Sequence, residues 1–283
     1  MPSLIDIRRR IRSVRNTQQI TKALKMISAA KLRKAQDRAL AARPYATILQ
    51  QMLANVAQAA GDSAENPLLA VRPENRILLI VITADMGKAG GFNANLIRMA
   101  QRFVDEHRSN QLTLDLVGKK GRDYFRKRGV RIHAEYVDIF RVVRYETADQ
   151  IADAVLDLFA KADIDAVYLF GNEFKSVMSS HLVGKRLLPI EIPQAAAPVD
   201  YIYEQPPAEL LGSLLPRYVK AQIYRALLES SAAEHAARMT AMDAASSNAS
   251  DMIDSLTLYL NRVRQASITK EIIEVVSGAA ALE

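Results

Sequence analysis

The chain has 283 residues, a formal net charge of +7 and no cysteine. The lack of thiols excludes disulfide bonds, thiolate metal ligands and a cysteine nucleophile. No run of 18 apolar residues predicts a membrane-spanning helix, and the four histidines lack metal-ligand spacing. Residues 1–45 hold twelve Lys or Arg and only two acids. Such a basic segment attracts nucleic acid, acidic lipid or an acidic protein surface.

The first 60 residues predict a long helix, from about 3 to 59, which we assign to an N-terminal coiled-coil domain at 1–60. Ser3 and Asp6 have the spacing of a capping box. Pro44 is expected to kink the helix or to remove one hydrogen bond. Apolar residues then recur at helical spacing. The expected stripe consists of Leu4, Ile7, Ile11, Val14, Ile20, Ala23, Leu24, Ile27 and Ala30.

The middle of the chain changes character after a linker at 61–73. Runs of β-branched and apolar residues alternate with helical stretches, which predicts a mostly parallel sheet. We expect a Rossmann-like α/β domain at 74–195. The expected strands are 76–83, 112–117 and 166–170, with weaker ones at 130–136 and 187–192, and the expected helices are 93–107, 121–128 and 147–161.

Residues 217–277 contain no glycine or proline, which predicts a single helix of roughly 90 Å. A compact chain of this length is only about 50 Å across, so the helix is expected to protrude and to need a partner. We assign a C-terminal coiled-coil domain at 207–283, paired antiparallel with the first helix, and expect Gly278 to end the helix. The expected stripe is Leu256, Tyr259, Leu260, Val263, Ala266, Ile268, Ile272, Val275 and Val276.

Residues 230–250 of that helix are mainly Ala, Ser and charged residues. Small side chains allow helices to approach closely but bury little area each. The segment is therefore either a closely packed part of the coiled coil or a part that slides against another surface.

The loop ADMGKAGGFN, residues 84–93, follows the first strand and opens a helix. Phosphates bind at this place in α/β folds, but the loop matches neither the Walker A pattern nor G-x-G-x-x-G. We interpret Gly87, Gly90, Gly91 and Asn93 as structural turn residues, with Asn93 as a helix cap. Because no acid pair, triad or metal cluster accompanies them, we expect no catalytic, cofactor-binding or metal-binding residue.

Four segments together resemble the gamma subunit of bacterial F-type ATP synthases. They are ITKEIIEVVSGAAA at 268–281, IRRRIRSVRNTQQITKALKMISAAKLRKAQ at 7–36, RPYA at 43–46 and ITADMGKAGGFNANL at 82–96. In the last segment the family usually has Ser at Ala84, a basic residue at Met86 and Leu at Lys88. The likeness spans essentially the whole chain.

The resemblance implies a rotor shaft that couples ion-driven rotation of a membrane c-ring to the beta-subunit catalytic sites. The implied partners are three alpha and three beta subunits around the coiled coil, and the epsilon subunit and c-ring at the α/β domain. It implies no bound cofactor, no nucleic acid, and a peripheral location on the cytoplasmic face of the bacterial plasma membrane. The implied contacts to beta are Arg264, Gln265, Thr269, Arg238, Lys22, Leu24 and Lys25.

Two other classes of protein compete with this interpretation. The basic N-terminal helix suits a coiled-coil protein that binds nucleic acid, but the first 44 residues contain no aromatic side chain and no base-reading motif. The other class is an α/β enzyme with a helical oligomerisation hairpin. The lack of grouped acid and base residues suited to catalysis argues against an enzyme.

Overall fold

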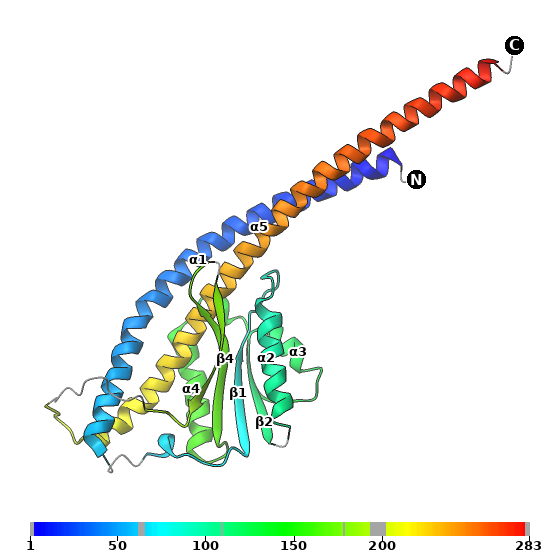
Figure 1. Cartoon of the computed structure of the whole chain (residues 1–283). Helices are drawn as coiled ribbons and strands as arrows, with labels where there is room; N and C mark the ends of the chain where they lie inside the picture. Colours follow the sequence, from blue (N-terminus) through cyan, green and yellow to red (C-terminus); the bar gives the residue numbers. More distant parts are fainter. Residues whose placement is uncertain (1–2, 62–65, 109, 178, 193–201, 281–283) are drawn as a thin grey trace. The chain divides into compact units, whose positions relative to one another are not determined.

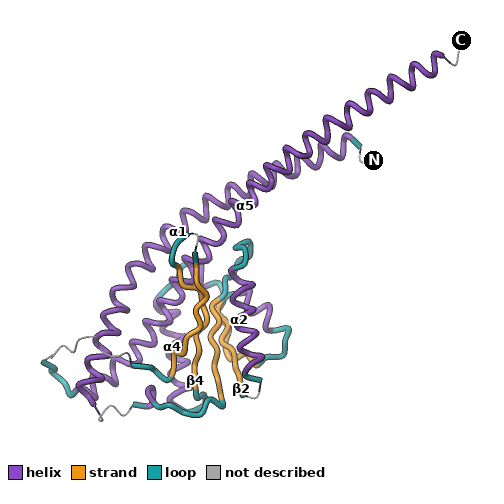
Figure 2. Tube along the Cα trace, in the orientation of Figure 1, coloured by secondary structure: helices purple, strands orange, loops and turns teal. Residues whose placement is uncertain are grey.

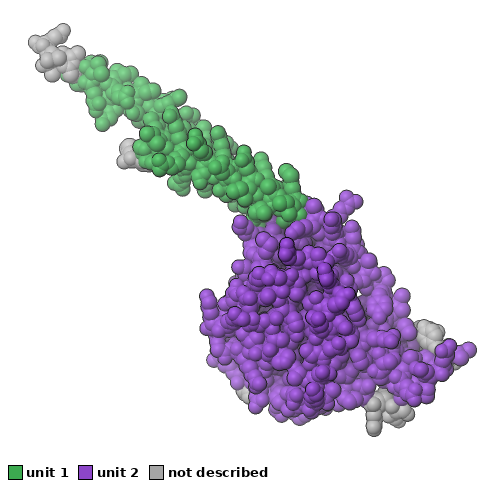
Figure 3. Space-filling view, turned by 180° about the vertical axis from the view of Figure 1, so that it is seen from behind, with its two compact units in different colours: residues 1–28, 239–283 green, residues 29–238 purple. Residues whose placement is uncertain are grey.

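The computed structural model describes residues 3–61, 66–108, 110–177, 179–192 and 202–280, with side chains up to residue 277. The chain divides into two compact units (Figure 3). Unit 1 comprises residues 1–28 and 239–283, and unit 2 comprises residues 29–238. The two long terminal helices, α1 and α5, each contribute to both units.

Helix α1 runs from Leu4 to Ala60 and continues through Pro44, whose ring nitrogen has no hydrogen to donate. The expected capping box is present at its start. The backbone N–H of Ser3 donates to Asp6 Oδ2 at 3.3 Å, and the N–H of Asp6 donates to Ser3 Oγ at 3.2 Å. The Ser3 hydroxyl also donates to Asp6 Oδ2 at 2.8 Å, and this bond is the main reason that the pKa of Asp6 is lowered.

Helix α5 runs from Pro207 to Ala280. The expected stop at Gly278 is therefore wrong. A glycine inside a helix costs only about 1 kcal/mol relative to alanine, so it ends a helix only where the chain adopts a left-handed turn there.

Five strands form the sheet of unit 2, and they are drawn in orange in Figure 2. They are β1 (Arg76–Ile82), β2 (Gln111–Val117), β3 (Arg131–Tyr136), β4 (Ala166–Phe174) and β5 (Ser180–Leu188). Their order is β3-β2-β1-β4-β5; the first four are parallel and β5 is antiparallel to β4. The predicted mostly parallel α/β sheet is confirmed.

Alternate residues of β1 face two different helical layers. Leu78, Ile80 and Ile82 belong to one buried cluster with side chains of α1, α4 and α5, whereas Leu79 and Val81 pack with α2 and α3. The helices are α2 (Phe92–Glu106), α3 (Lys119–Phe125) and α4 (Tyr145–Ala160), with short 3-10 turns at Pro67–Leu69 and Ile139–Arg141. Both faces of β1 are therefore buried, as its unbroken apolar run predicts.

The expected strand at 187–192 was misplaced, because β5 occupies Ser180–Leu188. Most of β5 is exposed or half-buried at the edge of the sheet, and only its last two residues are buried. An edge strand with His181, Gly184 and Lys185 has no continuous apolar pattern, so the sequence pattern indicated only its buried end.

Within unit 2, helix α5 is enclosed on all sides over ten residues. Every residue from Leu227 to Ala236 is buried. Side chains of α1, α4, α5 and the sheet form one core in unit 2, and Figure 1 shows the ribbons of these elements. The Ala and Ser residues at 230–233 fit this position because only small side chains allow close approach on every side.

Unit 1 consists of the α1 and α5 segments packed as an antiparallel pair. Thr21 Oγ1 lies 2.7 Å from Ser246 Oγ, and Lys25 Nζ lies 2.6 Å from Asp243 Oδ1. The residue number rises on α1 as it falls on α5, so the predicted antiparallel pairing is confirmed.

The seam between these helices follows a heptad pattern, with steps of three and four. On α1 the seam positions are Leu4, Ile7, Ile11, Val14, Gln18, Thr21, Lys25 and Ser28, and on α5 they are Met242, Ser246, Ala249, Ile253, Leu256, Leu260 and Val263.

After Val14 the predicted α1 stripe was wrong at every residue except Leu24, which is half-buried. Ile20 and Ile27 are 57% and 52% exposed, whereas the polar Thr21 and Ser28 are buried. The α1 positions that face α5 recur with a period of 3.5, which places Ile20 and Ile27 one residue before the seam positions Thr21 and Ser28. The Thr21 hydroxyl is satisfied across the seam by Ser246.

Candidate functional site

The three α1 residues that the sequence assigns to beta contacts lie close together on unit 1 and differ in their surroundings. Lys22 is exposed and Leu24 is half-buried. The ammonium of Lys25 forms an ion pair within the chain, to Asp243. Of the two lysines, only Lys22 has no ion-pair partner among the described residues, so its charge is the more available to a partner.

Arg264, Gln265 and Thr269 lie on the α5 part of unit 1, and all three are exposed. The Thr269 hydroxyl donates to the Gln265 carbonyl at 2.9 Å, one turn back along the helix. Within the part of the chain that the structure describes, the side chains of Arg264 and Gln265 have no hydrogen-bond or ion-pair partner. An arginine head with five free N–H donors is suited to binding carboxylates or carbonyls of another protein.

The end of α5 exposes many large apolar side chains. Every residue from Ile268 to Ser277 is exposed. The large apolar members are Ile268, Ile272, Ile273, Val275 and Val276, which are 48–72% exposed. A continuous apolar helix surface of this kind indicates contact with another protein.

Arg238, the remaining predicted beta contact, is buried in unit 2 with 7% of its surface exposed. Its Nη2 pairs with Glu234, and its Nε and Nη2 both donate to the carbonyl of Gly87 at 3.3 Å. The structure therefore joins Arg238 to the 84–93 loop, which the sequence treated as separate. Its guanidinium is engaged inside the chain.

Two side chains of the 84–93 loop accept the hydrogen bonds that hold it in place. The N–H of Ala84 donates to Asn93 Oδ1 at 2.9 Å, and Asp85 Oδ1 accepts from the N–H groups of Lys119 and Asp138 at 3.1 and 3.0 Å. The expected cap by Asn93 is wrong. Helix α2 begins one residue earlier, with Gly91 at its N-cap, so Asn93 reaches back to the loop instead.

The glycines of this loop have different roles. Gly90 has φ 54°, in the left-handed region that favours glycine. A side chain at Gly91 would meet Asn95 at 2.9 Å. At Gly87 a Cβ would make only an ordinary contact, 3.7 Å from Lys120, so the contribution of Gly87 is its carbonyl, which accepts from Arg238.

Burial and charge compete at the Arg238 cluster. Burial raises the pKa of Glu234, while Arg238 lowers it. Burial also lowers the pKa of His235 to about 4, helped by the charges of Arg238 and Lys31. The imidazole is therefore neutral at pH 7, and its Nδ1 lies 3.3 Å from Arg238 Nη1.

Sequence reasoning missed a second buried carboxylate of α5. Glu229 is bound by Arg43 at 2.9 and 3.2 Å and by the N–H of Phe174 at 3.1 Å. Arg43 also donates to the Phe174 carbonyl at 2.9 Å. The RPYA motif contains Arg43 and was the available signal, but its partner lies 186 positions away in the chain.

Among the described residues no three His, Asp or Glu side chains gather as a metal site. None of the described helices is long and apolar enough to span a bilayer.

Comparison with known proteins assigns the chain to a family. The ATP synthase family model matches residues 3–282. The ATP synthase gamma chain of Solibacter usitatus is 65% identical and that of Pelotomaculum thermopropionicum 51% identical, each over the full length of both chains.

Solved structures show the same fold. A Tetrahymena thermophila mitochondrial ATP synthase central stalk/c-ring structure contains a chain that is 28% identical, with a TM-score of 0.64, covering 80% of this chain and 99% of that one. A chain of a Euglena gracilis mitochondrial ATP synthase structure (OSCP/F1/c-ring) is 18% identical with a TM-score of 0.70, covering 99% and 94%.

Paired terminal helices with a Rossmann-like sheet between them in the chain define an α/β protein with an antiparallel coiled coil. The similarity of its sequence to known proteins identifies the family more specifically than the fold does. The chain belongs to the family of ATP synthase gamma chains, and the resemblance inferred from its motifs is confirmed.

Proposed function

We propose that this chain is the central rotor shaft of a bacterial F-type ATP synthase and has no catalytic residue of its own. Its coiled-coil segments, 1–60 and 207–283, contact a ring of three alpha and three beta subunits. Its α/β domain, 74–195, contacts the epsilon subunit and the c-ring. The complex holds it at the cytoplasmic face of the plasma membrane.

The observation that carries this proposal is the exposed end of α5. Ten consecutive residues, Ile268–Ser277, are exposed, and five of them are large and apolar. Leaving such a surface in water is unfavourable by about 25 cal/mol for each Å². A surrounding protein ring supplies the apolar contact that this helix lacks.

The paired helices present different residues on different sides, so the shaft has no threefold symmetry. A single asymmetric shaft therefore contacts three identical beta subunits in three ways. Contacts that differ between conformations shift the populations of those conformations. Rotation of the shaft then passes each beta subunit through states of different nucleotide affinity.

The individual contacts rest on the resemblance to the family, and exposure and charge decide which residues are available for them. We assign the exposed Arg264 and Gln265 to a beta-subunit loop, and Lys22 to the acidic lever of beta. Leu24, Lys25 and Thr269 lie within a turn of these contacts and border them. Arg238 is assigned to bracing the 84–93 loop, because its guanidinium is already bonded to Glu234 and Gly87.

Reconstitution with separately purified alpha and beta subunits tests the proposal. We expect a complex with one copy of this chain for three beta subunits, and ATPase turnover well above that of alpha and beta alone. The absence of a complex, together with retention on duplex DNA that falls steeply with salt, would instead favour a nucleic-acid-binding protein.

A further inference from the structure

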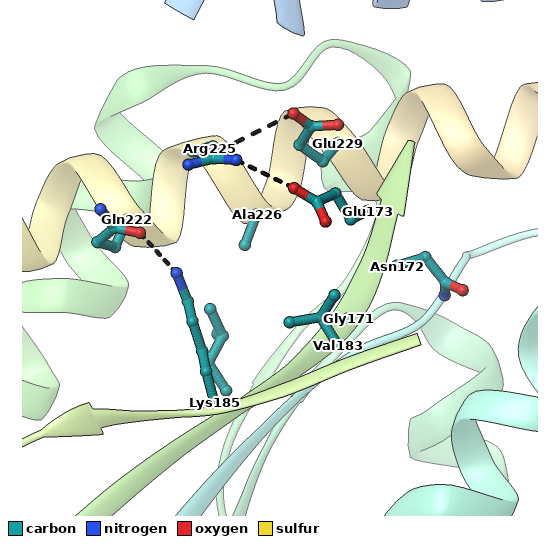
Figure 4. A pocket seen from close by; sticks show the side chains of 10 residues that line it. Gly171, Asn172, Glu173, Val183, Lys185, Gln222, Arg225, Ala226 and Glu229 are labelled. Atoms are coloured by element: carbon teal, nitrogen blue, oxygen red, sulfur yellow. Dashed lines mark hydrogen bonds and ion pairs between the residues drawn. The ribbon is translucent and has the colours of Figure 1, made fainter. Parts of the chain in front are cut away.

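A cavity of about 190 Å³ lies in unit 2 between the β4–β5 hairpin and α5 (Figure 4). The antiparallel register pairs Leu169 with Lys185 and Gly171 with Val183, so these four residues share one face of the hairpin. Gly171 has no side chain and Ala226, opposite on α5, has only a methyl group. A Cβ at Gly171 would lie 3.2 Å from Ser230 Oγ, so the short side chain of Ala226 is what leaves this space open on the α5 side.

Lys185 lines this cavity from β5, and Asn172 and Glu173 line it from β4. The Nζ of Lys185 donates to Gln222 Oε1 at 2.5 Å (Figure 4). Within the described residues it has no carboxylate at ion-pair distance. Burial, followed by the charge of Arg225, lowers its pKa to about 8, while Glu173 acts in the opposite direction. The amine is thus mostly protonated at pH 7 without a counter-ion.

The other charges around the cavity are already paired. Arg225 lies 3.1 Å from Glu173 and 3.9 Å from Glu229. Glu229 is also bound by Arg43. The ammonium of Lys185 is therefore the charge left for a ligand. The two carboxylates oppose a multiply charged anion and favour one that carries a single negative charge.

The remaining wall is formed by the aliphatic side chains of Leu169, Val183 and Ala226 together with the polar Asn172. Small-molecule sites are typically apolar with a few convergent polar groups. A ligand that pairs with the Lys185 ammonium and also contacts the aliphatic wall has one carboxylate and a short apolar body. The volume admits a molecule of a few non-hydrogen atoms.

We propose that this cavity binds a short-chain aliphatic monocarboxylate, with its carboxylate at the ammonium of Lys185 and its apolar body against the aliphatic wall. The inference is independent of the rotor assignment. Small ligands gain only a limited binding free energy from each non-hydrogen atom, and here the ligand replaces an existing hydrogen bond to Gln222. We therefore expect a dissociation constant on the order of 1 mM.

The test uses the full-length chain with labelled valine, leucine and isoleucine methyl groups. Butyrate is titrated at pH 7 and the shifts of the Val183 and Leu169 methyl signals are followed by NMR. Butanamide and propylammonium, which carry the same propyl group, are titrated in parallel. Saturable shifts at these two residues with butyrate only are expected. Equal shifts with all three probes would overturn the proposal, because the site would then select only the apolar body.

Two substitutions separate the charge from the volume. Lys185→Met removes the ammonium and is expected to weaken butyrate binding at least tenfold. Ala226→Leu fills the cavity while keeping Lys185, and should abolish saturable shifts. Lys127→Met, at an exposed turn, is the matched control with unchanged affinity. Circular dichroism verifies that each variant is folded. Unchanged binding in folded Lys185→Met would contradict the proposal, and so would unchanged binding in folded Ala226→Leu.

The pH dependence gives a further readout. Binding of an anion requires protonated Lys185, whose pKa is about 8, so affinity should fall as pH rises from 7 to 9.5. The other charged groups that line the cavity are Glu173, Glu229 and Arg225. The Lys185→Met variant should lack this pH dependence. Affinity that stays constant from pH 7 to 9.5 in the unsubstituted chain would count against the assignment.

Discussion

The double substitution R264A with Q265A is expected to lower coupled ATP synthesis about tenfold or more while leaving the chain folded. Both side chains are exposed, so their loss should change the free energy of unfolding by less than about 0.5 kcal/mol. Truncation of an arginine that becomes buried in an interface costs roughly 2–5 kcal/mol. The measurement is ATP synthesis by membrane vesicles driven by an imposed ion gradient.

Arg262→Ala is the matched control for this experiment. Arg262 is also exposed, but two residues along a helix it points about 160° away from Arg264. It should retain most of the activity if one face of α5 contacts beta. Normal synthesis in the double variant, with the subunit assembled, would show that Arg264 and Gln265 do not have the proposed roles.

The substitution E234A is expected to destabilise unit 2 by roughly 3–5 kcal/mol, because it leaves the charge of Arg238 buried without a counter-ion. Arginine does not lose its proton in proteins, so the charge cannot be removed. Arg238 would keep only its contacts to the Gly87 carbonyl and to His235. Thermal unfolding of the full chain measures the loss, at about 2–4 °C for each kcal/mol in a unit of this size.

The substitution R238A is expected to cost less than E234A, although the same ion pair is broken. Burial already raises the pKa of Glu234, and Arg238 opposes that rise. Without Arg238 the carboxyl can take up a proton and become neutral. The folded state then binds a proton more tightly than the unfolded state, so the stability of R238A should increase as pH falls from 7 to 5.

The comparison of these two variants isolates the role of Arg238. Equal losses of stability, with no pH dependence in R238A, would contradict the account of a buried arginine paired with a protonatable acid. If R238A keeps its thermal stability but lowers ATP synthesis, the result would instead support the prediction that Arg238 contacts the beta subunit.

The sequence predicted the elements of this fold well where a single periodic signal dominated. The run from Arg76 to Ile82 is buried on both faces, and the glycine-free stretches became α1 and α5. The sequence failed to predict burial where tertiary packing decides which residues face the core. Thr21 and Ser28 lie in the seam while Ile20 and Ile27 are exposed, because the partner helix fixes the heptad register, whatever the apolar content.

In the candidate site, too, some features were predicted from the sequence and others were not. Motifs placed Arg264 and Gln265 on a helix, and both are exposed there. The sequence carried no sign that Arg238 would reach Gly87, 151 positions away, or that Arg43 would bind Glu229. Such pairs depend on which faces of α1 and α5 meet the sheet, and that is settled by long-range packing.

The most direct test of the rotor assignment is the observation of rotation in single complexes. Because the chain has no cysteine, Lys127→Cys provides one attachment point for a bead, with alpha and beta subunits fixed to a surface. We predict ATP-dependent rotation in one direction with three pauses in each turn, one for each beta subunit. A complex that hydrolyses ATP while the bead remains stationary would contradict the assignment of this chain as the rotor.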